Sequence, residues 1–184
     1  MIQPIYLYGS EVLRDKAEEV DLTDKEGIAT LIQDLKDTLK HSDGCGLAAP
    51  QIGVSKRALI VDGTGMVDVY DYLKDFKRTM INPVIIEESE DENVYSEGCL
   101  SIPGIYGDVK RPASITVEYY NEDGEKVTEK FDKFACRMVQ HEMSHLDGDM
   151  FVDHLAPIRK KMVAKKLLNI SKGKVSAHYN TKLK

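Results

Sequence analysis

The sequence contains no long apolar run, and no stretch approaches the roughly 18 consecutive apolar residues that a membrane-spanning helix needs. The first residues, MIQPIYLYGSEVLRDK, also lack the basic start and apolar stretch of a secretory signal. They equally lack the Arg-rich, acid-poor composition of a transit peptide. We therefore expect no membrane association and a cytoplasmic location.

Cysteine is scarce, since the chain has only Cys45, Cys99 and Cys136. An odd count of three argues against a disulfide framework and fits a reducing cytosol. There a cysteine is free to bind a metal as a thiolate, although an isolated cysteine is more often a small buried hydrophobe. We expect that simpler role for Cys136, beside an apolar stripe, and for Cys45, in a turn without acidic or histidine partners.

The C-terminal part of the chain lacks acidic residues, and no Asp or Glu follows Asp153. Residues 155–184 hold nine Lys or Arg side chains, whereas the other 154 residues carry 16 basic and 31 acidic ones, a net charge of −15. A basic tail on an acidic body indicates a polyanionic partner. The alternative is a solvated helix face and a frayed terminus, and the sequence leaves both interpretations open.

The remaining composition, 42% hydrophobic and 30% charged over 184 residues, is typical of one globular domain. Apolar spacing and capping residues predict three helices: Thr23 to Ser42, Asp132 to about Leu146, and Pro157 to Ile170. Thr23 and Glu26 match a capping box at the first helix. The third helix is expected to rest on the body through three apolar residues, Ile158, Met162 and Leu167.

Strand patterns fill the middle of the chain, at residues 57–61, 80–87, 114–120 and 125–131. Pro83 suggests an edge or a bulge, and Asn121-Glu122-Asp123-Gly124 predicts a hairpin turn. The polar residues 62–78 form either an ordered insertion or a mobile loop. We expect a single α+β domain over residues 1–184. Its antiparallel strands pack around the central helix, with an N-terminal helix and a basic C-terminal helix and tail, residues 155–184.

The central helix carries the most informative stretch, His141-Glu142-Met143-Ser144-His145, an H-E-x-x-H pattern. Two histidines four residues apart project from one helix face and can hold one metal ion between them. The intervening glutamate is the usual general base for a metal-bound water. A hydrolytic site of this kind also needs a third protein ligand and an open position for water.

The third ligand is not at either common downstream position. An H-E-x-x-H-x-x-G-x-x-H extension would require histidine at residue 151, which is Phe151, and no Asp or Glu follows Asp153. His154 and His178 lack supporting context. An upstream ligand remains, and Cys99 lies between two glycine-containing turns, but its residue context alone does not distinguish a ligand from a buried hydrophobe.

Three segments together resemble the peptide deformylases: Gly44 to Gln51 (GCGLAAPQ), Glu97 to Ser101 (EGCLS) and Gln140 to Gly148 (QHEMSHLDG). They are similar to the family's G-x-G-L-A-A-x-Q, E-G-C-L-S and Q-H-E-x-D-H-x-x-G motifs, in order and at similar separations. Three independent motifs in order are highly specific. Weaker likeness around Val12-Leu13-Arg14 and Ile81-Asn82-Pro83 extends the resemblance over most of residues 10–150.

One residue departs from the family pattern, because Ser144 stands where the family usually has Asp. This position points away from the metal on the helix. A hydroxyl can hydrogen-bond but cannot form an ion pair, so we expect a cost in local stability or metal retention and not a loss of function.

The resemblance implies that Cys99, His141 and His145 bind one divalent metal ion. One thiolate and two neutral imidazoles leave a net charge of about +1 and an open position for water. It also implies iron(II) as the native metal, with nickel, cobalt or zinc able to substitute, and a soft thiolate with imidazoles suits several of these ions.

The implied reaction is removal of the formyl group from N-formylmethionyl peptides of newly made chains. Glu142 would take the proton of the metal-bound water, and the Gln51 side-chain amide and Leu100 backbone N–H would stabilise the carbonyl oxygen. Four residues are candidates to line the substrate pocket: Cys45, Gly46, Gly98 and Met138. Met138 can equally be plain core, and Gln51 can be a turn residue that bonds its own backbone.

Two other functions are weighed against this one. The first is an H-E-x-x-H metallo-endopeptidase, which the missing downstream ligand disfavours. The second is a non-catalytic metal-binding protein that associates with the ribosome, but a structural site would need a fourth protein ligand. For the deformylase itself, the basic tail is a candidate for contact with the ribosome, and we expect no specific DNA binding.

Overall fold

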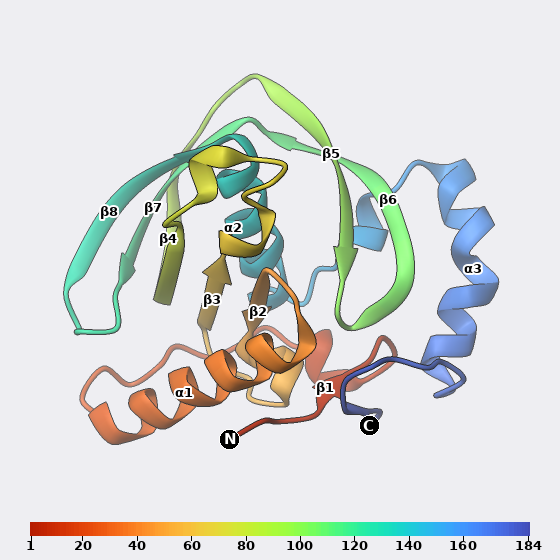
Figure 1. Ribbon diagram of the computed structural model, residues 1–184, viewed down its shortest axis with the longest axis horizontal. Helices are drawn as coiled ribbons and strands as arrows, with labels where there is room; N and C mark the ends of the chain where they lie inside the picture. Colours follow the sequence, from red (N-terminus) through yellow and green to blue (C-terminus); the bar gives the residue numbers. More distant parts are fainter.

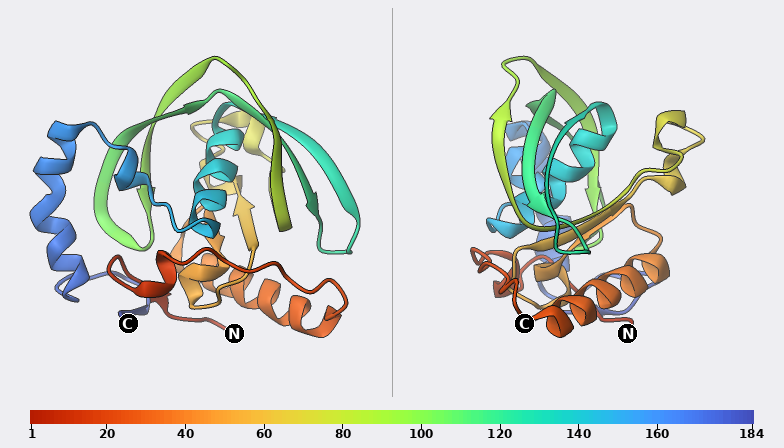
Figure 2. Two further views of the ribbon diagram at one scale, coloured as in Figure 1. Left: turned by 180° about the vertical axis from the view of Figure 1, so that it is seen from behind. Right: turned by 90° about the vertical axis from the view of Figure 1, so that its left-hand side faces the viewer.

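A computed structural model describes residues 1–184, and its centre is the helix α2 (Lys133–Leu146). In Figures 1 and 2, α2 stands between a five-stranded antiparallel sheet and a two-stranded hairpin. The large sheet has the order β2-β3-β4-β7-β8, and the hairpin is β5-β6. Helix α1 (Lys25–Ser42) crosses below the large sheet, and α3 (Pro157–Ser171) lies outside the hairpin. This arrangement confirms the expected α+β class.

Four strands of the large sheet, β3, β4, β7 and β8, coincide with predicted segments, whereas its remaining strand β2 and the short strands β1 and β9 were not predicted. The bounds of the strands are β1 Ile5–Tyr6, β2 Gly46–Ala48, β3 Ala58–Asp62, β4 Lys77–Glu88, β5 Glu92–Cys99, β6 Ile102–Pro112, β7 Ser114–Tyr120, β8 Lys126–Asp132 and β9 Thr181–Lys182. The hairpin β5-β6 was not predicted. Its residues are rich in Glu, Asp, Gly and Pro, which are depleted in strands, so only its packing against α2 reveals it.

Pro83 lies at a bulge in β4. The pairing of β4 with β7 changes register between Ile81 and Val84, while β4 lies inside the sheet between β3 and β7. Asn82 adopts a positive φ of 49° there, and its side-chain amide exchanges two hydrogen bonds with the Val20 backbone. Of the two alternatives, the bulge is confirmed. Because β3 pairs only with residues 77–81, Pro83 also lies where β4 has β7 as its sole partner strand.

The helix starts differ in detail from the predictions. Helix α1 is capped by Asp24, whose carboxylate accepts the Gly27 N–H at 3.0 Å, so the capping box at Thr23 is wrong. The Thr23 hydroxyl instead donates to Asp21 at 2.7 Å. Asp132 does occupy the N-cap position of α2, but its side chain makes no capping hydrogen bond.

The packing of α3 contradicts the expected contact face. Ile158 and Met162 are 72% and 66% exposed, whereas Val163 and Ile170 are buried against the body. Leu167 is partly buried as expected. With Leu168, the helix therefore exposes three large apolar side chains beside its lysines.

Residues 62–78 form an ordered insertion. Two short 3-10 turns, Thr64–Met66 and Asp71–Leu73, bring Leu73 into full burial. The Tyr70 ring stacks on Phe134 near the start of α2, with ring centroids 4.8 Å apart. Of the two alternatives, the mobile loop is therefore wrong.

The basic tail returns to the body after α3. Strand β9 pairs in parallel with β1, with Ile5 opposite Thr181 and Tyr6 opposite Lys182. Figures 1 and 2 both place this last segment alongside β1. A frayed terminus is thus wrong for this part of the tail. None of the helices has the length and apolar character needed to cross a membrane.

Candidate active site

The three predicted metal ligands lie together. Cys99 stands at the end of β5, where the hairpin turns, and His141 and His145 lie one helical turn apart on α2. Their ligand atoms are all within 4.8 Å of one another, and Cys99 Sγ is 3.4 Å from His145 Nε2. The hairpin therefore supplies the third donor that the downstream sequence does not contain.

The orientation of His141 is fixed by Glu97, two residues before Cys99 on the same strand. His141 Nδ1 lies 2.8 Å from Glu97 Oε1, and this contact leaves Nε2 free as a ligand atom when Nδ1 carries the proton. Glu97 is itself held by Arg111 from β6 and Arg137 from α2, each at 2.9 Å. Sequence reasoning assigned no role to these three residues. Only the spacing of Arg137, one turn before His141, hinted at a shared helix face.

This ion-pair cluster keeps Glu97 charged. Burial by itself would raise the pKa of Glu97, but hydrogen bonds from His141 and Arg111 lower it far below its ordinary value. Burial would likewise lower the pKa of His141, and hydrogen bonds with Cys99 and Glu97 instead raise it well above its ordinary value. Positive charge is therefore favoured between Cys99 and Glu97.

The residues present fit a divalent cation. Burial, together with the neighbouring His141, lowers the pKa of His145 well below its ordinary value, so His145 is a neutral imidazole. His145 Nδ1 and Glu142 Oε2 are buried without a hydrogen-bond partner, which is costly in a closed protein interior. One sulfur and two imidazole nitrogens form a donor set that suits zinc or iron, and the structure groups no fourth protein ligand with them.

Glu142 lies beside these donors. Its Oε1 is 3.9 Å from His141 Nε2, and its side chain is buried. Burial raises the pKa of Glu142 to about 7. A carboxyl group with such a pKa can accept and return a proton near neutral pH.

Gln51, in the turn Ala49–Ile52 that follows β2, also contacts the cluster of metal-ligand atoms, at Cys99. Its Oε1 accepts the Ala48 N–H at 3.0 Å, which directs Nε2 to Cys99 Sγ at 3.4 Å and to Ser101 Oγ at 3.1 Å. The alternative interpretation of Gln51, a turn residue bonded to its own backbone, is correct in that this local hydrogen bond is present. The same bond orients the side-chain amide toward the site. Leu100 follows Cys99 directly, and its carbonyl oxygen accepts a hydrogen bond from Tyr179 at 2.6 Å.

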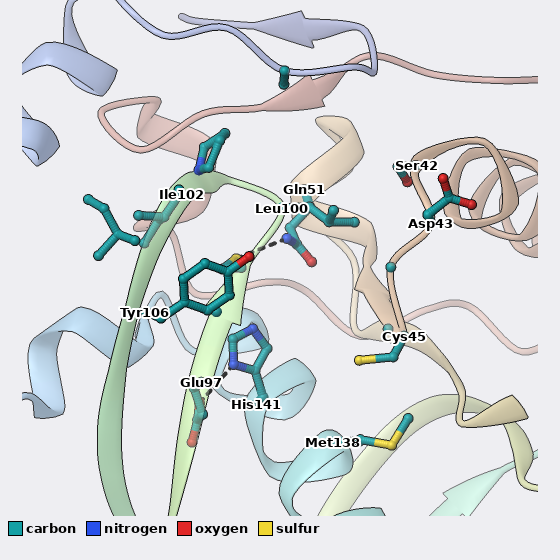
Figure 3. A pocket seen from close by; sticks show the side chains of 18 of the residues that line it. Ser42, Asp43, Cys45, Gln51, Glu97, Leu100, Ile102, Tyr106, Met138 and His141 are labelled. Carbon is teal, nitrogen blue, oxygen red and sulfur yellow. Dashed lines mark hydrogen bonds and ion pairs between the residues drawn. The ribbon is translucent and has the colours of Figure 1, made fainter. Parts of the chain in front are cut away.

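A cavity of about 790 Å³ adjoins these groups, and Figure 3 shows Cys45, Met138 and His141 around it. All four predicted pocket residues line this cavity: Cys45, Gly46, Gly98 and Met138. A side chain at Gly46 would come within 2.7 Å of Glu142 Oε1, so glycine keeps that wall open.

Cys45 differs from its predicted surroundings. Burial and then the nearby Glu142 raise the pKa of the Cys45 thiol, while His141 opposes this effect. The expectation that Cys45 has no acidic or histidine neighbours is therefore wrong, because the turn after α1 folds back onto α2. Cys136 is buried at 1% exposure, as expected for a small hydrophobe.

Ser144 lies behind the site. Its hydroxyl accepts a hydrogen bond from Arg111 at 2.9 Å and donates one to the Gln140 carbonyl at 2.9 Å. Ser144 therefore touches Arg111, which also holds Glu97, and not the cluster of ligand atoms.

Comparison with known proteins identifies the family to which the chain is similar in sequence and in structure. The sequence model of the protein family described as polypeptide deformylase matches residues 2–161 of the chain. A peptide deformylase of Christiangramia forsetii is 41% identical, with 97% of this chain and 94% of that protein covered. The structure of peptide deformylase from Thermus thermophilus has a TM-score of 0.83 at 36% identity, covering 94% of this chain and 99% of that one. A Plasmodium falciparum peptide deformylase structure also gives 0.83, at 33% identity, covering 92% and 95%.

Proposed function

We propose a mechanism for this protein that follows from its family. The chain belongs to the polypeptide deformylase family. Enzymes of this family are hydrolases that remove the formyl group from nascent polypeptides. The observation that carries the mechanism is the meeting of three donor atoms with a buried Glu142, one of whose oxygens has no hydrogen-bond partner, and with no fourth protein ligand.

Cys99, His141 and His145 hold one divalent ion in this proposal. Iron(II) is the proposed native ion, and nickel, cobalt or zinc can replace it because the donor set suits each of them. When bound, the ion supplies Lewis acidity, which polarises the carbonyl and makes water more acidic. Glu97 keeps the His141 ring oriented and supplies negative charge behind it.

Glu142 moves the proton. Its carboxylate takes a proton from the water whose oxygen forms a bond to the formyl carbon. It then gives that proton to the methionine nitrogen as the carbon–nitrogen bond breaks, which releases the free amine and formic acid, and the acid loses its remaining proton to solvent as formate. The pKa of about 7 supports both transfers near neutral pH.

Gln51 Nε2 and the Leu100 backbone N–H stabilise the negative charge that develops on the formyl oxygen. The hydrogen bond from Ala48 supports this role for Gln51, since it holds the amide nitrogen toward the site before substrate binds. Such preorganised donors are effective because they need no rearrangement during the reaction.

The cavity beside Glu142 binds the formylmethionine residue. Cys45, Gly46, Gly98 and Met138 line it, and the flexible Met138 side chain suits an apolar substrate side chain. A side chain at Gly46 would crowd Glu142, so glycine leaves the space beside that carboxylate in which a formyl group, whose carbon carries only hydrogen, can bind.

The basic α3 is proposed to bring the enzyme to its substrate in the cytoplasm. Four exposed lysines lie on α3: Lys160, Lys161, Lys165 and Lys166. Arg159 is engaged with the Tyr106 carbonyl and contributes less. Nascent formylated chains emerge from the ribosome, whose RNA phosphates such lysines would contact.

Formate release from formyl-Met-Ala-Ser by anaerobically purified, metal-analysed protein tests the proposal. We expect formate in proportion to bound metal and no cleavage of unformylated peptides. Cleavage of internal peptide bonds would favour the endopeptidase. Stoichiometric metal without formate release would favour the non-catalytic metal protein.

A further inference from the structure

Residues near the C-terminus contact the turn from Cys99 to Ser101, which contains Leu100. The Tyr179 hydroxyl donates to the Leu100 carbonyl at 2.6 Å, although 79 positions separate the two residues. Both side chains are partly buried and pack against one apolar cluster. Ser176, Ala177 and His178 join Tyr179 in lining the 790 Å³ cavity.

This segment is anchored to the body by backbone hydrogen bonds directly after Tyr179. The Ile5 N–H donates to the Asn180 carbonyl at 2.8 Å, and the Leu7 N–H donates to the Lys182 carbonyl at 2.9 Å. Before Tyr179, His178 Nε2 lies 3.6 Å from Asp43 Oδ2, on the opposite rim of the cavity. The tyrosine is therefore held from the body and does not rely on its contact with Leu100 for its place.

The turn from Cys99 to Ser101 is otherwise held at its two ends. Gln51 Nε2 donates to Cys99 Sγ and to Ser101 Oγ. The Tyr8 N–H donates to the Ser101 carbonyl at 2.8 Å. The hydrogen bond to the middle residue of the turn comes from Tyr179.

We propose that Tyr179 is a positioning residue for deformylation, and that its hydroxyl holds Leu100 so that the Leu100 N–H faces the formyl oxygen. The inference rests on the proposed function, because that function assigns the Leu100 N–H its role. The Leu100 N–H and carbonyl are separated by the φ and ψ dihedrals of Leu100. Because Gln51 holds Cys99 on one side, fixing the Leu100 carbonyl on the other side limits rotation about these two dihedrals. Burial raises the pKa of Tyr179 to about 12, which keeps the hydroxyl protonated as a donor.

The test compares Tyr179→Phe with Tyr119→Phe in the full-length, zinc-loaded enzyme. Tyr119 is a matched control, because its hydroxyl also makes one hydrogen bond of 2.7 Å, to Glu129, away from the cavity. Loss of one positioning bond should lower kcat about 3- to 10-fold in Tyr179→Phe, with KM within about twofold, since the Leu100 N–H acts mainly in the transition state. Tyr119→Phe should keep the wild-type kcat.

A second readout follows the Leu100 amide directly in ¹⁵N-leucine-labelled protein. Exchange of this amide with solvent should be several-fold faster in Tyr179→Phe and unchanged in Tyr119→Phe. A kcat within twofold of wild type, an equal loss in the control, or unchanged exchange at Leu100 would each overturn the inference. Absence of formate release by the wild-type enzyme would instead overturn the proposed function, so the two failures are distinguishable.

Discussion

At the scale of single residues, Glu142 combines burial, an unpaired oxygen and a pKa raised to about 7. Replacing Glu142 with Ala leaves all three donor atoms in place. Metal content should stay near one per chain, and kcat should fall by at least the ~10²–10⁴-fold typical of losing a general base. Metal analysis with formate release measures both quantities. Near-normal turnover of a metal-loaded Glu142→Ala protein would contradict the assigned role.

The ligand role of Cys99 is open to a spectroscopic test. Cobalt(II)-substituted protein should absorb in the near ultraviolet through thiolate-to-metal charge transfer. This band should vanish in Cys99→Ser, because a hydroxyl replaces the thiolate. Cys45→Ser and Cys136→Ser are the controls and should keep the band, since neither sulfur belongs to the donor cluster. A band that survives in Cys99→Ser would show that the ligand assignment is wrong.

At the scale of elements, the site depends on docking of the β5-β6 hairpin against α2. Glu97 joins them, because it pairs with Arg111 of β6 and with Arg137 and His141 of α2. The Arg137 side chain is only 2% exposed, so it has little access to water as an alternative partner.

Glu97→Ala would leave Arg137 buried without its carboxylate. We expect a loss of about 3–5 kcal/mol in the free energy of unfolding, as for other broken buried ion pairs. Metal affinity should also fall about 10- to 100-fold, because His141 loses the partner that orients it. Denaturant unfolding and metal titration measure the two effects. Glu129→Ala, which removes a carboxylate from the more exposed pair with Arg78, is the control and should keep metal affinity.

At the scale of the whole molecule, charge is divided between an acidic body and the lysines of α3. Reversing Lys160, Lys161, Lys165 and Lys166 to Glu should weaken co-sedimentation with ribosomes and flatten its salt dependence, because fewer counterions are released. Turnover of a short formyl peptide should be unchanged, since these side chains are exposed and do not line the cavity.

Four exposed lysines distant from α3 in sequence provide the matched control: Lys16, Lys25, Lys74 and Lys130. Reversing their charge changes the net charge equally. Equal weakening of ribosome co-sedimentation in both variants would show that α3 is only a solvated helix face and has no specific role in docking. Truncation after Ile170 is unsuitable as a test of docking alone, because it also deletes the strand β9 that pairs with β1 and takes Tyr179 out of the cavity wall.

The sequence by itself determined the fold class, the family, the three main helices and four of the five strands of the large sheet, all but β2. Local signals account for this success. Apolar spacing marks α1 and α2, and the turn at Asn121 to Gly124 marks the hairpin of β7 and β8. The motifs around Gln51, Cys99 and His141 also identified residues that the fold then brings together, because each motif is short and continuous.

Tertiary structure decided what depends on contacts between distant segments. Glu97, Arg111 and Arg137 form one buried cluster only after the hairpin docks on α2, and no local pattern encodes that meeting. The same reason explains why Cys45 faces Glu142 and why Tyr179 reaches Leu100. Backbone propensity acts over a few residues, whereas burial and hydrogen-bond pairing are set by neighbours in space.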